Sequence, residues 1–360
     1  MRLERTRAHP DGQTVWMATL WVLHVDLDQF IAAVEVLRRP ELAGQPVVIG
    51  GRGDPTERGV VSTASYEARK FGVGSGMPLR TALKKCPDAI FLPVDAPEYN
   101  AASVHVMETL RSLEAVVEVL GWDEAFLGVE TEDPEAFAKE TQAAVLAATR
   151  LHCSVGIGDN KLRAKIATEF GKPQGMFRLT EENWYDVMAD RPTDALWGIG
   201  RKTAKRLAAL GINTVRELSE TDAQGLADEI GPTMGPWYRR LGRGVDSSPV
   251  VGTPWVARSH SRERTFQQNL TEWVDVETEV RRLAHEVTDD IRREERPAVR
   301  VAVKVRFAPF NTHTRSLTLP GETSDPEVIA DAAVDLVNRF DGDRAIRLLG
   351  VRAEMTPPPE

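Results

Sequence analysis

Residues 21–31 read WVLHVDLDQFI, and this stretch decides the fold. The apolar run from Trp21 to Val25 predicts a β-strand, and an acidic turn follows it at once. A helix is expected from Gln29 to about Arg38, with Asp28 as its N-cap. A strand that ends in Asp26 places a carboxylate at the edge of a sheet.

A second acidic pair lies almost a hundred residues further on. The runs 116–120 and 125–129 predict a hairpin with its bend at Gly121-Trp122-Asp123-Glu124. One sheet containing both segments would bring Asp26, Asp123 and Glu124 together, where they would raise one another's pKa unless a cation lay between them. Oxygen ligands favour Mg²⁺ or Mn²⁺, and two such ions could serve phosphoryl transfer. A helix cap and a solvated hairpin tip remain the alternative from these residues alone.

The rest of the chain predicts an α+β protein of several domains. Further strands are expected at 46–49, 60–64, 153–157, 299–307, 314–319 and 346–355, and helices at 65–71, 79–86, 98–113, 135–152, 161–170, 274–293 and 326–340. The alternation indicates sheet layers with helices on one face, and the last hundred residues form a β-α-β-β-α-β-like module. Gly, Ser and Pro between 243 and 257 predict a domain boundary.

Composition sets outer limits on function. The chain has 360 residues, a formal net charge of −9 and two cysteines, which excludes a disulfide framework and fits a reducing cytosol. Residues 1–18 are expected to be a disordered extension, although their arginines before an apolar run imitate a secretory signal; Met17 is an alternative start. No run reaches the ~20 apolar residues of a membrane span.

Four motifs, in order, resemble those of the Y-family translesion DNA polymerases, most closely the DNA polymerase IV (DinB-type) branch. They are VLHVDLDQFIAAVE at 22–35, STASYEARKFGVGSGMP at 62–78, GWDEAFLGV at 121–129 and VGIGDNKLRAKIATEFGKPQG at 155–175. The resemblance implies a right-hand polymerase with a ferredoxin-like palm (19–29 and 95–185), small fingers (30–94), a helix-hairpin-helix thumb (186–243), a linker (244–256), an α+β little finger (257–356) and a tail (357–360).

The resemblance also implies a metal site. Asp26 and Asp123 would be shared by two divalent ions, Mg²⁺ or Mn²⁺, with the Leu27 carbonyl as a further ligand, and Glu124 would complete the ion that activates the primer 3′-hydroxyl. The hairpin departs from the family at Gly121 and Trp122, which replace a Ser and a smaller apolar residue. Neither change removes a ligand, so altered packing is expected.

A triphosphate pocket is implied beside the metals. The start of the helix at Gln29 and Phe30 offers free amides to an anion. The resemblance adds Tyr66, Arg69 and Lys161 as contacts to the β- and γ-phosphates, with help from Thr63.

Ile31 stands where the family normally carries Tyr or Phe beneath the sugar. In the family, the aromatic ring at this position acts as a gate that blocks a 2′-hydroxyl. The smaller side chain of Ile31 predicts weaker selection against ribonucleotides, and so ribonucleotide incorporation. The alternative is that the β-branched Ile31 still excludes a 2′-hydroxyl.

A positive segment, Leu196 to Arg216, contains five cations and no acidic residue. It resembles a helix-hairpin-helix whose turn, Gly198-Ile199-Gly200, would bind a DNA phosphate, aided by Arg201, Lys202 and Lys205. Trp197 replaces the more usual Pro. A plain turn between helices is the alternative.

The function expected is therefore that of a cytoplasmic, template-directed DNA polymerase of low fidelity without proofreading. Its partners would be primer-template DNA, dNTPs and possibly rNTPs; it would act as a monomer away from membranes, and a sliding clamp is left open. The rivals are a catalytically silent DNA-binding scaffold of the same fold and a cyclase-like nucleotidyl enzyme. Three carboxylates argue against the first rival, and the positive segment argues against the second.

Overall fold

The computed structural model describes residues 19–340 and 342–358. The expectations for residues 1–18 lie outside this range. The chain divides into two compact units: residues 19–53, 61–76 and 85–254 form the first, and residues 54–60, 77–84 and 255 onward form the second. No helix in the described ranges is both long and apolar enough to cross a membrane.

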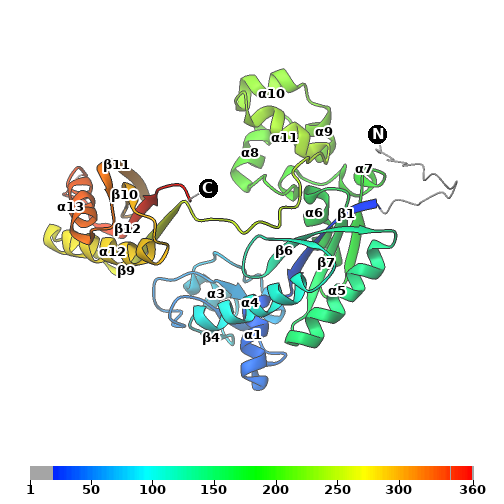
Figure 1. The fold of residues 1–360 in the computed structure, drawn as a ribbon, viewed down its shortest axis with the longest axis horizontal. Helices are drawn as coiled ribbons and strands as arrows, with labels where there is room; N and C mark the ends of the chain where they lie inside the picture. Colours follow the sequence, from blue (N-terminus) through cyan, green and yellow to red (C-terminus); the bar gives the residue numbers. More distant parts are fainter. Residues whose placement is uncertain (1–18, 341, 359–360) are drawn as a thin grey trace. The chain divides into compact units, whose positions relative to one another are not determined.

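A five-stranded sheet is the centre of the first unit (Figure 1). Its order is β5 (Val116–Val119), β6 (Glu124–Thr131), β1 (Thr19–Leu27), β7 (Cys153–Gly158) and β8 (Met176–Leu179). β1 runs antiparallel to both of its neighbours, and β7 is parallel to β8. The strand that ends in Asp26 is therefore the middle strand of the sheet.

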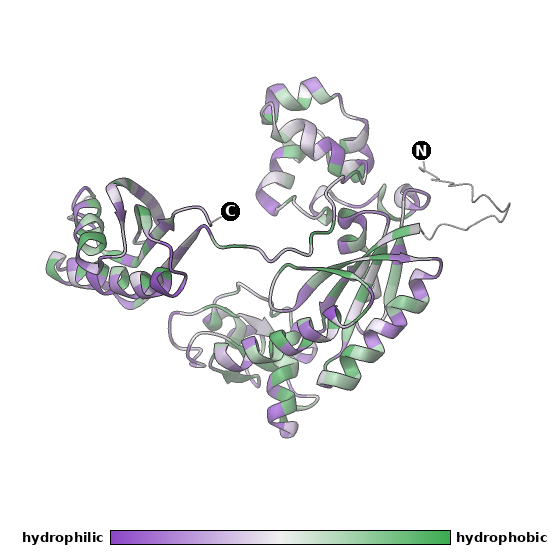
Figure 2. Cartoon of the chain, viewed as in Figure 1, coloured by the Kyte–Doolittle hydropathy of each residue, from purple (hydrophilic) through white to green (hydrophobic). Residues whose placement is uncertain are grey.

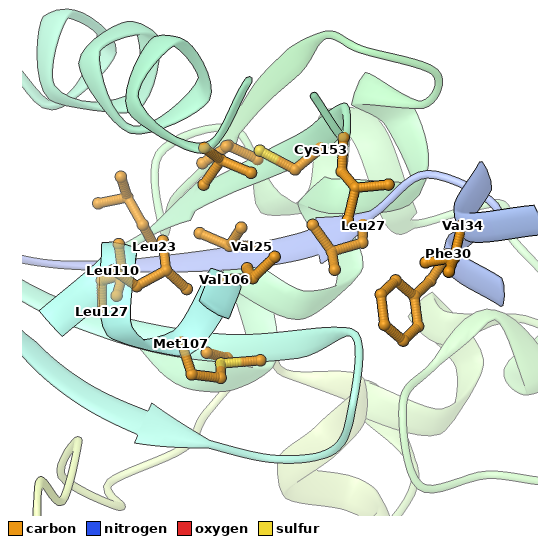
Figure 3. Packing of buried hydrophobic residues seen from close by; sticks show 14 of the residues in the cluster. Leu23, Val25, Leu27, Phe30, Val34, Val106, Met107, Leu110, Leu127 and Cys153 are labelled. Atoms are coloured by element: carbon orange, nitrogen blue, oxygen red, sulfur yellow. The ribbon is translucent and has the colours of Figure 1, made fainter. Parts of the chain in front are cut away.

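The two faces of β1 are covered by different helices, because side chains alternate along a strand. Leu23, Val25 and Leu27 pack in a core with α4 (Ala96–Arg111) and α5 (Pro134–Thr149), as Figure 3 shows for part of the cluster. His24 and Asp26 point to the other face, toward α6 (Lys161–Gly171). The expectation of helices on one face is wrong for this sheet, which has helices on both.

Gly156 on β7 allows α6 to approach the sheet. A Cβ at this position would lie 1.9 Å from the Ala164 carbonyl oxygen and 2.5 Å from the Thr168 amide nitrogen. Only a glycine fits so close to helix backbone. This close approach sets the height of α6 above His24 and Asp26.

The segment that follows β1 begins with α1 (Phe30–Arg38) and the short η1 (Pro40–Leu42). A three-stranded sheet, β3-β2-β4 (Thr63–Ala64, Val47–Ile49, Ile90–Leu92), lies beside α2 (Tyr66–Arg69), and α3 (Leu79–Lys85) precedes β4. The buried Glu35 of α1 accepts a hydrogen bond from the Tyr99 hydroxyl of α4 at 2.6 Å. This bond fastens α1 to α4.

Short helices make up the positive segment and its surroundings. They are α7 (Trp184–Met188), η2 (Thr193–Ala195), α8 (Arg201–Ala209), α9 (Val215–Glu220), α10 (Ala223–Ile230) and α11 (Met234–Gly242). They share a core that includes Leu207, Leu218 and Leu226. The element before the Gly-Ile-Gly turn is a single 3₁₀ turn.

Residues 250–252 lie along the edge of the first unit's sheet. Val250 packs on Gly128, whose Cβ would lie 3.3 Å away, and the Val251 N–H donates to the Glu118 carboxylate at 2.6 Å. Lys161 donates to the same carboxylate at 2.7 Å. The chain is thus attached to the sheet just before the second unit begins.

The second unit contains a four-stranded antiparallel sheet with two helices on one face. The order is β11 (Asn311–Thr323), β10 (Ala298–Phe307), β12 (Ile346–Met355) and β9 (Ser259–Leu270). α12 (Trp273–Arg293) and α13 (Pro326–Val337) pack their apolar stripes on it, and hydrophilic and hydrophobic residues alternate along these helices in Figure 2. The chain order β9, α12, β10, β11, α13, β12 is the expected β-α-β-β-α-β order. The sequence predicts no bounds for the first strand, β9, in which Phe266 is the only buried residue.

Candidate functional site

The three predicted carboxylates meet at one edge of the five-stranded sheet. Asp26 on β1 is directly opposite Glu124, the first residue of β6, and Asp123 precedes it. The Leu27 N–H donates to the Asp123 carbonyl oxygen at 2.8 Å, which extends the ladder by one bond. The register of β1 on β6 therefore creates the cluster that the sequence predicts.

Trp122, in the same bend, packs against the body of the unit. Its ring lies edge-on to that of Tyr99, with the centroids 6.5 Å apart. The bulky residue of the hairpin therefore has a partner on α4 and stays clear of the carboxylates.

His24 belongs to this site and was missed in the sequence. Single ligand atoms of His24, Asp26 and Glu124 lie within 4.8 Å of one another. The signal was available, since His24 and Asp26 are two residues apart on a strand and must share a face. Burial lowers the pKa of His24, which favours the neutral ring. A neutral imidazole has one donor and one acceptor, and its Nδ1 lies 2.8 Å from Thr168 Oγ1 while its Nε2 lies 3.2 Å from Glu124.

Two lysines reach the carboxylates from α6 and the residue after it. Lys165 forms an ion pair with Glu124, and its Nζ lies 3.1 Å from Nε2 of His24. Lys172 Nζ lies 3.0 Å from Asp26 and 2.7 Å from Glu169. Neither lysine was singled out in the sequence, because their distance from Asp26 depends on how α6 lies across the sheet.

Burial separates the pKa values of the three carboxyl groups. Desolvation raises the pKa of Asp26, and desolvation with the neighbouring Glu124 raises that of Asp123. The hydrogen bond from His24, together with Lys165, lowers the pKa of Glu124 to about 2. Two partly desolvated carboxyl groups beside a firmly ionised one form an oxygen-rich donor set that suits a hard divalent cation.

Asp28 does not cap α1, so the N-cap prediction is wrong. The cap position is Gln29, with φ 44°, and it makes no side-chain cap bond. Asp28 is buried and accepts hydrogen bonds from the Tyr66 hydroxyl (2.8 Å), the Ser154 hydroxyl (2.9 Å) and the Gln174 N–H (2.8 Å). A buried carboxylate with three donors holds α2 against the sheet.

Tyr66 and Arg69 lie together, as their spacing predicts. The Gln29 side chain accepts from the Tyr66 N–H at 2.6 Å, and the Arg69 guanidinium lies 5.0 Å from the centre of the Tyr66 ring. Arg69 Nε donates to the Ala64 carbonyl at 2.9 Å, and Thr63 lies one residue earlier on β3. Burial and Asp28 raise the pKa of Tyr66, so its hydroxyl remains a donor.

At the start of α1, Phe30 is buried in the same core as β1. Ile31 is half-buried and packs against that core. The two residues follow the turn at Asp28 and Gln29, so Ile31 lies five residues from Asp26 in the chain.

The structure does not bring Lys161 to the carboxylate cluster. It is buried, pairs with Glu118, and lies 5.5 Å from the centre of the Phe126 ring. Glu118 pairs in register with Phe126, two residues along β6 from Glu124. Lys165 and Lys172 are the lysines that pair with the cluster.

A cavity of about 470 Å³ opens beside the cluster. His24, Asp26 and Lys165 line one side, and Arg191 and Trp197 line another. Lys165 Nζ also lies 5.5 Å from the centre of the Trp197 ring. The cavity therefore leads from the carboxylates to the positive segment.

The Gly-Ile-Gly turn places cations at the surface. Gly198 has φ +100°, and a Cβ there would lie 2.8 Å from the Trp237 ring, so a glycine is required. Ile199 is buried, while Gly200 is the N-cap of α8 and offers no side chain to its amides. Arg201, Lys202 and Lys205 of α8 are exposed. A helix N-terminus with adjacent cations can bind a phosphate.

Known proteins share both the sequence and the fold. The impB/mucB/samB family matches residues 25–169, and the C-terminal domain of that family matches residues 257–358. A protein of Mycobacterium bovis called DNA polymerase IV 2 is 50% identical over 342 residues, which are 94% of this chain and 99% of that protein. DNA polymerase IV of Methanoculleus marisnigri is 40% identical over 341 residues, 93% and 94% of the two chains.

Two solved structures resemble this one over 93% of the chain and 98% of their own, each at 27% identity. A Y-family DNA polymerase chimera, Dbh-Dpo4(243-245)-Dbh, aligns with a TM-score of 0.83. DinB from Sulfolobus solfataricus aligns with a TM-score of 0.63.

Proposed function

The chain belongs to the impB/mucB/samB family and is a DNA-directed DNA polymerase of the Y-family, in the DNA polymerase IV branch associated with translesion synthesis; from this premise we propose how its residues carry out the reaction. The substrates would be primer-template DNA and nucleoside triphosphates. The primer 3′-hydroxyl would attack the α-phosphorus, forming one phosphodiester bond and releasing pyrophosphate. The observation that carries the proposal is the register of Asp26 on Glu124.

The acidic cluster fits a two-metal site. Asp26 and Asp123 would be ligands of both ions, Mg²⁺ or Mn²⁺. Glu124 and the Leu27 carbonyl would be the further protein ligands. When bound, the ions would neutralise the charge that develops on the phosphoryl oxygens. His24 would orient Glu124 through its Nε2–H, since a hydrogen-bonded carboxylate has fewer orientations to lose on binding.

The cations around the cluster divide the remaining work. Tyr66 and Arg69 would contact the β- and γ-phosphates, with Gln29, Phe30 and Thr63 shaping that side of the pocket. We assign Lys172 to the triphosphate in place of Lys161, because Lys172 lies against Asp26. Lys165 would hold Glu124 in the absence of metal and would be free for the primer once the ion pair opens.

The DNA would be held by two cationic surfaces that read shape and not sequence. Amides at the start of α8 with Arg201, Lys202 and Lys205 would bind phosphates from the thumb. The face of the second unit's sheet that carries Arg300, Lys304 and Arg306 would lie along the duplex. Binding should therefore weaken steeply with salt.

Primer extension tests the proposal. Wild-type protein with dNTPs and either Mg²⁺ or Mn²⁺ should extend a primer on an undamaged template, and EDTA or Asp123→Ala should abolish extension. Asp123→Ala should still bind primer-template within about twofold. Binding without extension by the wild type would overturn the polymerase assignment in favour of a scaffold.

The sugar gate is a separate part of the proposal. Ile31 is smaller than an aromatic ring, and a shape change of this kind is worth about 1–3 kcal/mol, or roughly 10- to 200-fold in selectivity. Wild type should therefore incorporate rNTPs appreciably, and Ile31→Phe should restore discrimination by at least about tenfold. Equal ratios of dNTP to rNTP efficiency in the two proteins would contradict the proposal.

A further inference from the structure

A groove of about 370 Å³ lies in the second unit, away from the sheet face that carries Lys304. Its six lining residues come from the end of β10, from β11, and from the segment between α13 and β12: Phe307, His313, Thr314, Arg315, Phe340 and Arg344. His313 and Arg315 pair with Val305 and Val303, which face the helices. β11 is the last strand of the sheet, so the groove lies at its free edge beyond the end of α13.

The groove combines aromatic rings with guanidinium groups. Arg344 lies 4.3 Å from the centre of the Phe307 ring, and Arg315 lies 4.8 Å from the centre of the Phe340 ring. The two rings are in contact at 6.3 Å between centroids, tilted by 64°. Phe307 is buried and Phe340 is half-buried, so the two guanidinium groups lie over the rings and are the planar groups that a ligand would meet.

The two arginines differ from Arg262 and Arg281 of the same unit, which pair with carboxylates. Arg262 binds Asp290 through two hydrogen bonds of 2.6 Å, and Arg281 binds Asp331 at 2.7 Å. Arg315 and Arg344 form no ion pair within residues 19–340 and 342–358, and none of the six lining residues is acidic. Two unneutralised cations at one groove attract an anion.

The same hairpin repeats this combination at its tip. Phe310 is 66% exposed, with Arg347 4.6 Å and Arg306 5.8 Å from the centre of its ring. Arg347 lies where the β10–β12 register shifts, and such an irregularity redirects a side chain. A ligand longer than one unit would find a second stacking position here.

We propose that this groove binds nucleoside phosphate units, with the base stacked on a guanidinium plane beside the half-buried Phe340 and the phosphate held by Arg315 and Arg344. Aromatic stacking joined to cations is how proteins hold single strands without reading sequence. Unpaired DNA and free nucleotides share this chemistry, and the experiment separates them. The inference does not depend on the catalytic proposal, because the groove shares no residue with the carboxylate cluster.

Binding of a fluorescein-labelled 16-nucleotide oligo(dT) to the full chain tests the inference. Anisotropy is measured in EDTA without triphosphates, so catalysis plays no part. Arg315→Gln/Arg344→Gln should weaken binding about tenfold or more, since stacking is worth about 1–3 kcal/mol per base. The control Arg281→Gln/Arg282→Gln removes the same charge from α12 and should change binding by less than about twofold.

Two further arms identify the ligand. Blunt duplex DNA should bind the groove variant and wild type equally, whereas an equal loss for duplex and oligo(dT) would overturn the inference. Wild type is also titrated with dTMP as a competitor. Displacement of oligo(dT) by dTMP that disappears in the groove variant would assign the groove to free nucleotides as well, and its absence would assign it to strands alone.

A third variant guards against misfolding. Arg315→Lys/Arg344→Lys keeps both charges but removes the planar stacking groups, so its oligo(dT) affinity should fall between those of wild type and the Gln variant. Equal affinity of the Lys variant and wild type would contradict the stacking part of the proposal. Displacement of oligo(dT) by poly-glutamate at equal charge concentration, as strong as by unlabelled oligo(dT), would overturn the assignment to nucleoside phosphates.

Discussion

The two larger sheets, one in each unit, use their charged faces in opposite ways. On β1 of the first unit, the charged face is buried beneath α6, and it gathers carboxylates with lysines against them. On β10 of the second unit, the buried residues Val301, Val303 and Val305 face two helices, and the alternate positions carry Arg300, Lys304 and Arg306. Charges packed under a helix can hold a small ion in fixed geometry, whereas charges spread on an open face can follow a long polyanion.

The largest expected effect comes from neutralising one charge on each sheet. Asp26→Asn should slow primer extension about a thousandfold or more, because metal stabilisation of the transition state is worth several kcal/mol. Lys304→Gln should slow it less than about tenfold at saturating DNA. Both rates are read from single-turnover extension. Comparable losses of extension rate in the two variants would mean that the buried carboxylate and the open-face lysine contribute equally to the reaction.

Glycines on the two sheets provide the next test. Gly156→Ala pushes a Cβ into helix backbone, and should destabilise the first unit by about 3 kcal/mol or more. Gly350→Ala on β12 meets chiefly the flexible Glu263 side chain, with Cγ at 2.8 Å, and should cost less than about 1 kcal/mol. Scanning calorimetry measures the melting temperature of each variant. A larger fall in melting temperature for Gly350→Ala than for Gly156→Ala would contradict the view that β7 is covered closely by a helix and that β12 is open at Gly350.

A smaller effect is expected in DNA binding. Lys304→Gln should reduce the slope of log affinity against log salt by about one, since the variant neutralises one phosphate fewer. Asp26→Asn should leave that slope unchanged. Titrations of primer-template at several salt concentrations measure both slopes, and an unchanged slope for Lys304→Gln would remove the open face from the DNA interface.

The smallest effect concerns pH. The hydrogen bond from Arg262 lowers the pKa of Asp290 in the folded protein. The pair therefore stabilises the folded second unit fully at pH values above the pKa of an unfolded Asp. This stabilisation is lost as the pH falls through the lower pKa that Asp290 has in the folded state. Between about pH 5 and pH 3, wild type should lose more thermal stability than Asp290→Asn, by at most about 1 kcal/mol. Parallel pH profiles of the melting temperature for the two proteins would contradict this.

The sequence reveals local structure and charge better than it reveals tertiary placement. The strand through Asp26 and the hairpin at Asp123 and Glu124 could be predicted, because alternation and acidic turns are local signals. The bounds of β9 could not, since a mostly exposed strand has no hydrophobic alternation. Asp28 was misjudged as a cap, because its three donors come from distant parts of the chain.

The lysines illustrate the same limit. Lys161, Lys165 and Lys172 look equivalent in the sequence, and the motif resemblance favoured the first. Their roles are separated by where α6 crosses the sheet, which the close approach at Gly156 determines.

The attachment of residues 250–252 to the first unit has a kinetic consequence. The chain is fastened by the bond from Val251 to Glu118, and the second unit holds it again at Ala257, whose carbonyl accepts from Arg296 at 2.6 Å. The intervening connection of five residues can span at most about 20 Å. If both units bind DNA as proposed, a tether this short would keep the second unit at a high effective concentration, so that a unit which had released the DNA would bind it again before the other unit dissociated.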